Sequence, residues 1–100
     1  MKVFLIQQKQ IEELNDQGKL LGTSIQRFEE KKWVPLFRVV SEDGQQVTCS
    51  LRVKDTGEVR IWADLRLLAE WLREKLAIQR CELLLNDFEI PEIGVSNEQI

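Results

Sequence analysis

Histidine and tyrosine are both absent from this chain of 100 residues, and cysteine is limited to Cys49 and Cys81. Without histidine, the chain lacks the commonest general base, the commonest metal ligand and every Ser-His or Cys-His nucleophile pair. Two cysteines 32 positions apart do not make a zinc site, and the sequence has no glycine-rich phosphate loop. The sequence therefore predicts a protein that is not an enzyme and that has no metal site and no cofactor.

Long apolar runs are lacking as well. No stretch approaches the roughly 18 apolar residues that a membrane-spanning helix needs. The opening segment MKVFLIQQKQ has a short apolar part and no small-residue cleavage site of the kind that ends a secretory leader. These absences predict a cytoplasmic protein without a membrane contact. In that compartment we expect Cys49 and Cys81 to be reduced thiols at inward-facing strand positions.

The composition, 43% apolar and 31% charged, is that of an ordinary globular protein with one core. We expect a single domain over residues 1–87 and an acidic-apolar tail over residues 88–100. The net charge of −3 is unevenly distributed, because residues 1–80 hold all 14 bases against 12 acids while residues 81–100 hold five acids and no base. Such asymmetry is found both in proteins with a nucleic-acid or partner surface and in proteins with a tail that only aids solubility.

Turn residues divide the first two thirds of the chain into short elements. A helix is predicted over Gln8–Gln17, stopped by Gly18, with an initial strand over Lys2–Ile6 as a competing prediction. Asp43-Gly44 is a favoured two-residue turn, and Pro35 indicates a bulge or an edge position within its strand. Alternation of apolar and polar residues predicts strands over Leu20–Glu29, Trp33–Ser41, Gln46–Lys54 and Glu58–Trp62.

The last third of the chain predicts one helix and one strand. Asp64 can cap a helix over Leu65–Leu76, whose leucines form one stripe at helical spacing. A final strand is expected where Cys81, Leu83 and Leu85 alternate inward, before Asn86-Asp87 ends it. The tail places apolar residues among its acids, a pattern typical of a segment that adds to a sheet edge or a groove, in this chain or in a partner. These apolar residues are Phe88, Ile90, Ile93 and Val95.

The order of elements predicts an α+β fold. We expect an antiparallel four- to five-stranded meander sheet, with a C-terminal helix packed on one face and a short N-terminal helix. One face of this sheet is expected to be core and the other to be wet.

Basic and aromatic side chains gather on the predicted wet face. Because cations on alternate positions of neighbouring strands lie close together, they could follow a phosphate backbone while a tryptophan stacks on a base. The predicted contacts are Arg38, Arg52, Lys54, Arg60 and Trp62. Two alternatives stay open: a solvated sheet face carries charges in any case, and Trp62 could fold under the following helix.

Three short segments carry a family resemblance. Phe37-Arg38-Val39-Val40, the segment from Gly57 to Leu65 and the helix residues Leu68 to Leu72 with Ile78 together resemble small partition-associated accessory proteins of plasmids and integrative elements. Those proteins share a Gly-x-x-Arg-x-(aromatic) strand, a Ser/Asp-Leu helix start and a closing Leu-Gly-Ile, where this chain has Ala77 in place of the glycine. The match covers roughly residues 33–85, and it implies a role beside mobile DNA without identifying binding residues.

The sequence thus predicts a non-enzymatic accessory protein that binds single-stranded or double-stranded nucleic acid, or a nucleoprotein partner, through its basic face. The resemblance would place that role in plasmid or mobile-element maintenance. The alternative is a protein-interaction module, either a homodimer or a subunit of a larger assembly, in which a strand edge or the tryptophan-bearing face is buried in a partner.

Overall fold

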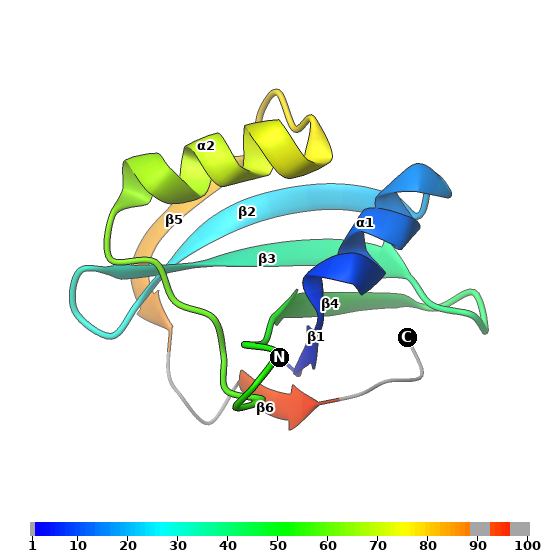
Figure 1. Ribbon diagram of the computed structural model, residues 1–100, viewed down its shortest axis with the longest axis horizontal. Helices are drawn as coiled ribbons and strands as arrows, with labels where there is room; N and C mark the ends of the chain where they lie inside the picture. Colours follow the sequence, from blue (N-terminus) through cyan, green and yellow to red (C-terminus); the bar gives the residue numbers. More distant parts are fainter. Residues whose placement is uncertain (1, 89–92, 97–100) are drawn as a thin grey trace.

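In the part of the chain that the structure describes, six strands form one sheet, and two helices pack on one of its faces (Figure 1). We describe a computed structural model of the chain, which covers residues 2–88 and 93–96. The elements follow the chain in this order: β1 Val3–Ile6, α1 Gln8–Asp16, β2 Leu20–Phe28, β3 Lys32–Val40, β4 Gln46–Leu51, α2 Leu65–Leu76, β5 Glu82–Phe88 and β6 Ile93–Ser96.

The sheet is mixed, with the strand order β5-β2-β3-β4-β1-β6. Only β2, β3 and β4 form the antiparallel meander, whereas β1 runs parallel to both β4 and β6, and β5 runs parallel to β2. The predicted four- to five-stranded antiparallel sheet is therefore wrong. The two competing predictions for the first residues both hold, because β1 is a strand and α1 follows it directly.

The segment from Glu58 to Trp62 does not become the predicted fourth strand of the meander. The free edge of β4 is taken by β1, in the register Val3↔Thr48 to Ile6↔Leu51. The chain after β4 instead forms isolated bridges, and the backbone N–H and C=O of Trp62 exchange hydrogen bonds of 2.8 Å with those of Trp33. These hydrogen bonds hold the segment beside the first residues of β3, which do not pair with β4.

A bulge or an edge position was predicted for Pro35, but it lies within β3, an interior strand, and pairs in register with Ile25 of β2. On the β4 side, the ladder of β3 covers Phe37 to Val40, and the next pairing is that of Trp33 with Trp62. Pro35 falls in the gap between these pairings, where its missing N–H leaves no ladder bond unmade. The Ser50 hydroxyl donates a hydrogen bond of 2.6 Å to the Pro35 carbonyl, which satisfies the acceptor in that gap.

Local signals explain both helices. The Asp64 carboxylate accepts a hydrogen bond of 2.9 Å from the Arg66 N–H at the start of α2. Ala77 adopts the left-handed conformation, with φ of 54°, and closes the other end. The two helices and the covered sheet face share one core, whose buried members are Ile6, Ile11, Leu14, Ile25, Phe37, Val39, Cys49, Leu51, Trp62, Leu68, Leu72 and Leu76.

The helix-free face of the sheet is also partly buried. A second cluster there consists of Val3, Leu5, Phe28, Val34 and Leu36, with Val59 packed against it. Val59 belongs to the segment that was displaced from the meander, so this segment covers apolar surface on the helix-free side. The expectation of one wet face is therefore wrong for this part of the sheet.

The edge strand β5 differs most from its predicted environment. Cys81, Leu83 and Leu85 were expected to point inward, but all three are exposed, Leu85 to 62%. The reason is topological: β5 is the outermost strand, whereas α2 packs against β3. From the predicted tail, β6 pairs in parallel with β1 at the opposite edge, while Ile90 lies outside the described residues.

Candidate functional site

The five predicted contact residues do not share one surface. Arg38 lies on β3 and lines a groove on the helix-free face, Trp62 belongs to the core under α2, and the other three line a separate cavity. These three are Arg52, Lys54 and Arg60. The predicted basic and aromatic face is thus divided into parts with different chemistry.

Trp62 is only 9% exposed, so the expectation that it faces solvent is wrong. Its ring lies 5.4 Å from that of Trp71 on α2, at an interplanar angle of 58°. The alternative, that Trp62 folds under the following helix, is the arrangement found. A ring in this position has no open face on which a base could stack.

A basic pocket of about 330 Å³ lies at the carboxyl ends of the parallel strands β1 and β4. The Arg52 N–H donates a hydrogen bond of 2.9 Å to the Ile6 carbonyl and ties the two strand ends together. The chain leaves β1 into α1 and leaves β4 into a turn, and such strand ends are where open sheets form ligand crevices. The pocket is lined by Gln7, Gln8, Lys9, Arg52, Val53, Lys54 and Arg60.

Arg60 is held in place from three sides. Its guanidinium lies 4.5 Å from the ring centre of Trp62 and 5.3 Å from that of Trp71, and Nη1 donates a hydrogen bond of 3.2 Å to Gln8 Oε1. Contacts of a guanidinium with aromatic faces are favourable, and they leave the N–H groups at its edge able to donate. The tryptophans therefore fix the orientation of the Arg60 side chain at the pocket.

Among the residues that the structure describes, no acid lines the basic pocket. The first turn of α1 carries no acid, and the nearby Glu12 accepts a hydrogen bond of 3.0 Å from the Gln8 amide. Within residues 2–88, Lys9, Lys54 and Arg60 form no ion pair. Arg52 is already engaged in an interaction. The local charge is thus strongly positive in a protein whose net charge is negative.

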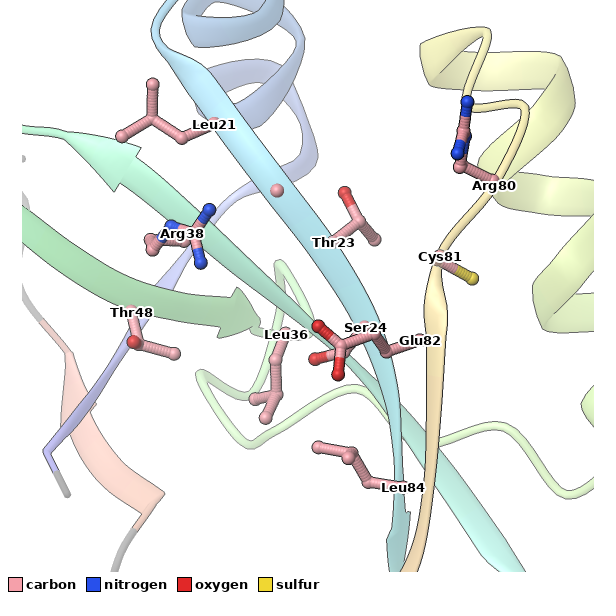
Figure 2. Close-up of a pocket in the computed structure, with 11 residues that line it drawn as sticks. Leu21, Thr23, Ser24, Leu36, Arg38, Thr48, Arg80, Cys81, Glu82 and Leu84 are labelled. Carbon is pink, nitrogen blue, oxygen red and sulfur yellow. The ribbon is translucent and has the colours of Figure 1, made fainter.

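Figure 2 shows the groove around Arg38, a cavity of about 660 Å³ on the helix-free face. Arg38 projects from β3 and Glu82 from β5, on either side of β2, with Leu36 and Leu84 nearby. The guanidinium lies over Gly22, where an added Cβ would come within 3.1 Å of Nη2. Because this groove combines both charges with leucines, it differs from the basic pocket and lacks the character of a phosphate surface.

Lys9 was missed by reasoning from the sequence. It occupies an exposed position in the first turn of α1, far along the chain from the other cations of the pocket. The only signal that could have found it is the parallel pairing of β1 with β4, because that pairing brings residues 7–9 beside residues 52–54.

The two thiols have different environments. Cys49 is fully buried, and burial raises the pKa of its thiol to about 12. Cys81 is exposed, and partial burial raises the pKa of its thiol in the same direction. A raised pKa makes a thiol a poorer nucleophile at neutral pH. Over the described ranges, no three His, Cys, Asp or Glu side chains gather in a way that could hold a metal ion.

No helix within the part of the chain that the structure covers is long and apolar enough to cross a membrane. No family model, no curated protein and no solved structure matches this chain.

Proposed function

We propose that this chain is a non-enzymatic accessory protein that binds nucleic acid, or a nucleoprotein partner, through the basic pocket. The observation that supports the proposal is the convergence of Arg52, Lys54 and Arg60 with Lys9 on one cavity, whose lining within the described part of the chain contains no acid. Backbone phosphates are the natural partners of such a cluster, since they attract several cations at once and release their counterions on binding.

The family resemblance adds a cellular role to this proposal. It suggests a cytoplasmic role in the maintenance of plasmids or other mobile elements, where an accessory protein would act beside DNA. Within the proposal, Trp62 supports Arg60 and does not touch a base. Arg38, in the groove of the helix-free face, is outside the proposed contact set.

Fluorescence anisotropy with a labelled 20-nucleotide single strand and the matching duplex tests the proposal. About three phosphate contacts to a single strand should reduce the affinity roughly 20-fold between 50 and 200 mM salt. The double change Lys54→Gln, Arg60→Gln should weaken binding at low salt. The matched control Arg73→Gln, Lys75→Gln removes the same charge from exposed positions of α2 and should have a much smaller effect. Absence of binding at 50 mM salt, or equal loss in both variants, would remove the proposal.

A different observation favours the interaction-module alternative. Within the described residues, β5 pairs only with β2. Two leucines of β5 are exposed, Leu83 to 47% and Leu85 to 62%. An open strand edge with exposed leucines is a common site of strand addition. Light scattering over a range of concentrations tests the homodimer form: a mass of 11.7 kDa at every concentration contradicts it, whereas a dimer that Leu85→Lys dissociates supports it.

A further inference from the structure

We infer that the basic pocket recognises the terminal phosphate of a nucleic acid strand, a phosphomonoester, in preference to the internal phosphodiesters of its backbone. The inference rests on the proposed function, because it specifies which phosphate the same pocket would hold. Three properties of the pocket support it: the concentration of its cations, the net charge of its lining and the fixed position of Arg60.

The cations are concentrated at one point and do not form a track. A strand that crosses a protein surface needs basic groups along its path, because its phosphates follow one another at regular intervals. Here the cations of the lining are spread along the chain from Lys9 to Arg60, but they meet in one cavity of about 330 Å³. This volume is at the small end of the range for small-molecule sites. Arg38, which would be needed to extend a path across the sheet, lies in the groove on the helix-free face. A cavity of this kind suits the end of a strand.

The charge of the lining also favours a monoester. A terminal phosphate carries roughly −1.5 to −2 at neutral pH and offers three acceptor oxygens, whereas an internal phosphodiester carries a single charge. Lys9, Lys54 and Arg60 line the pocket without an ion pair to any residue of the described ranges. Several cations that form no ion pair within the described residues are matched better by the dianion than by the monoanion.

Arg60 supplies the geometry. The stacked guanidinium has one N–H donor engaged by Gln8, and the contacts with Trp62 and Trp71 restrict its rotation. A fixed guanidinium loses less conformational entropy when it binds, and its planar fork matches two oxygens of one phosphate. Trp62 and Trp71 are positioning residues in this arrangement.

The test compares two single strands of the same sequence, labelled at the 3′ end, that carry either a 5′-phosphate or a 5′-hydroxyl. We expect the phosphorylated strand to bind about tenfold more tightly at pH 7.5, the factor that one further charge-assisted hydrogen bond provides. Lys54→Gln, Arg60→Gln should abolish the preference, with folding checked by circular dichroism. Trp71→Leu should reduce the preference and Trp71→Phe should largely keep it, because phenylalanine still offers a ring to Arg60. A separate titration with inorganic phosphate distinguishes a site for any phosphate from a site for a strand end. At a site for any phosphate, the inhibition constant of inorganic phosphate equals the dissociation constant of the phosphorylated strand; at a site for a strand end, the inhibition constant is much larger.

The pH dependence gives a second measurement. The second ionisation of a phosphomonoester lies near pH 6, and the chain has no histidine that would change its own charge in this range. The preference for the phosphorylated strand should therefore shrink between pH 7.5 and pH 5.5.

The outcomes separate the two proposals. Equal affinity for the two strands at pH 7.5, or a preference that survives Lys54→Gln, Arg60→Gln, overturns the inference and leaves the proposed function standing. An inhibition constant of inorganic phosphate equal to the dissociation constant of the phosphorylated strand also overturns it. If neither strand binds at 50 mM salt, the proposed function and the inference fail together.

Discussion

Replacement of Trp62 by alanine is the sharpest test of the arrangement around the basic pocket. The sequence placed this side chain on a solvated face, whereas the structure buries it under α2 with 9% of its surface exposed. A solvent-facing residue would tolerate the change at a cost within about 0.5 kcal/mol. A buried one would not, so the two arrangements predict clearly different stabilities.

The expected cost follows from the contacts of the ring. Truncation of a buried tryptophan to alanine costs about 3–5 kcal/mol. The tilted contact with Trp71 and the stacking of Arg60 on the ring are lost in the same change. These contacts are part of that cost, so we expect a loss of about 4 kcal/mol, in the middle of that range. This is a large part of the stability of a domain of this size, so Trp62→Phe, which keeps a ring, is the milder companion variant.

Urea unfolding followed by circular dichroism measures the change. The control Leu67→Ala removes an apolar side chain from α2 that is 62% exposed, and it should shift the free energy of unfolding by no more than about 0.5 kcal/mol. A Trp62→Ala protein that is within 1 kcal/mol of the unmodified chain would refute the packing described for Trp62, and with it the support for Arg60.

Three further outcomes are expected. In the native protein, Ellman's reagent should modify the exposed Cys81, whereas the buried Cys49 should react only on unfolding. Cys81→Ser should therefore leave no rapidly reacting thiol. Fast reaction of Cys49 in the native protein would contradict its burial. Folding raises the pKa of the Cys49 thiol from 9.0 to about 12, so the unfolded state loses this proton at a lower pH than the folded state. Urea titrations should therefore show the free energy of unfolding falling between pH 9 and 12 by roughly 1 kcal/mol per pH unit. Cys49→Ala should reduce this slope. The hydrogen bonds from Arg66 hold the pKa of Asp64 below its usual value, so the stability that its carboxylate confers at neutral pH should be lost as the pH falls through that lowered pKa; an acid-side profile unchanged by Asp64→Asn would be evidence against this.

Local patterns predicted the elements whose signals lie within a few residues. The bounds of α2, Leu65–Leu76, agree with the prediction because the Asp64 cap and the leucine stripe act within the helix itself. The strands β2, β3 and β4 were likewise found close to their predicted ranges, since alternation at period two is a local property.

Pairings between distant segments could not be predicted in the same way. Since β1 takes the free edge of β4, the segment from Glu58 to Trp62 meets β4 at its last residue, where the Arg60 N–H donates a hydrogen bond of 2.7 Å to the Leu51 carbonyl. The segment then bridges to Trp33 at the beginning of β3. The burial of Trp62 and the exposure of Leu83 and Leu85 both follow from which strands became neighbours. Period-two alternation shows that a strand has two faces, but it does not show which face a helix will cover.

The sequence by itself determined that a binding site in this chain uses cations without histidine, and it identified Arg52, Lys54 and Arg60 among the candidates. Only the tertiary structure decided that these three meet Lys9 in one pocket, that Trp62 supports Arg60 from within the core, and that Arg38 lies elsewhere. The physical reason is that charge and helical or strand character are properties of residues and short segments. The convergence of side chains depends instead on the parallel pairing of β1 with β4, which joins segments more than 40 residues apart.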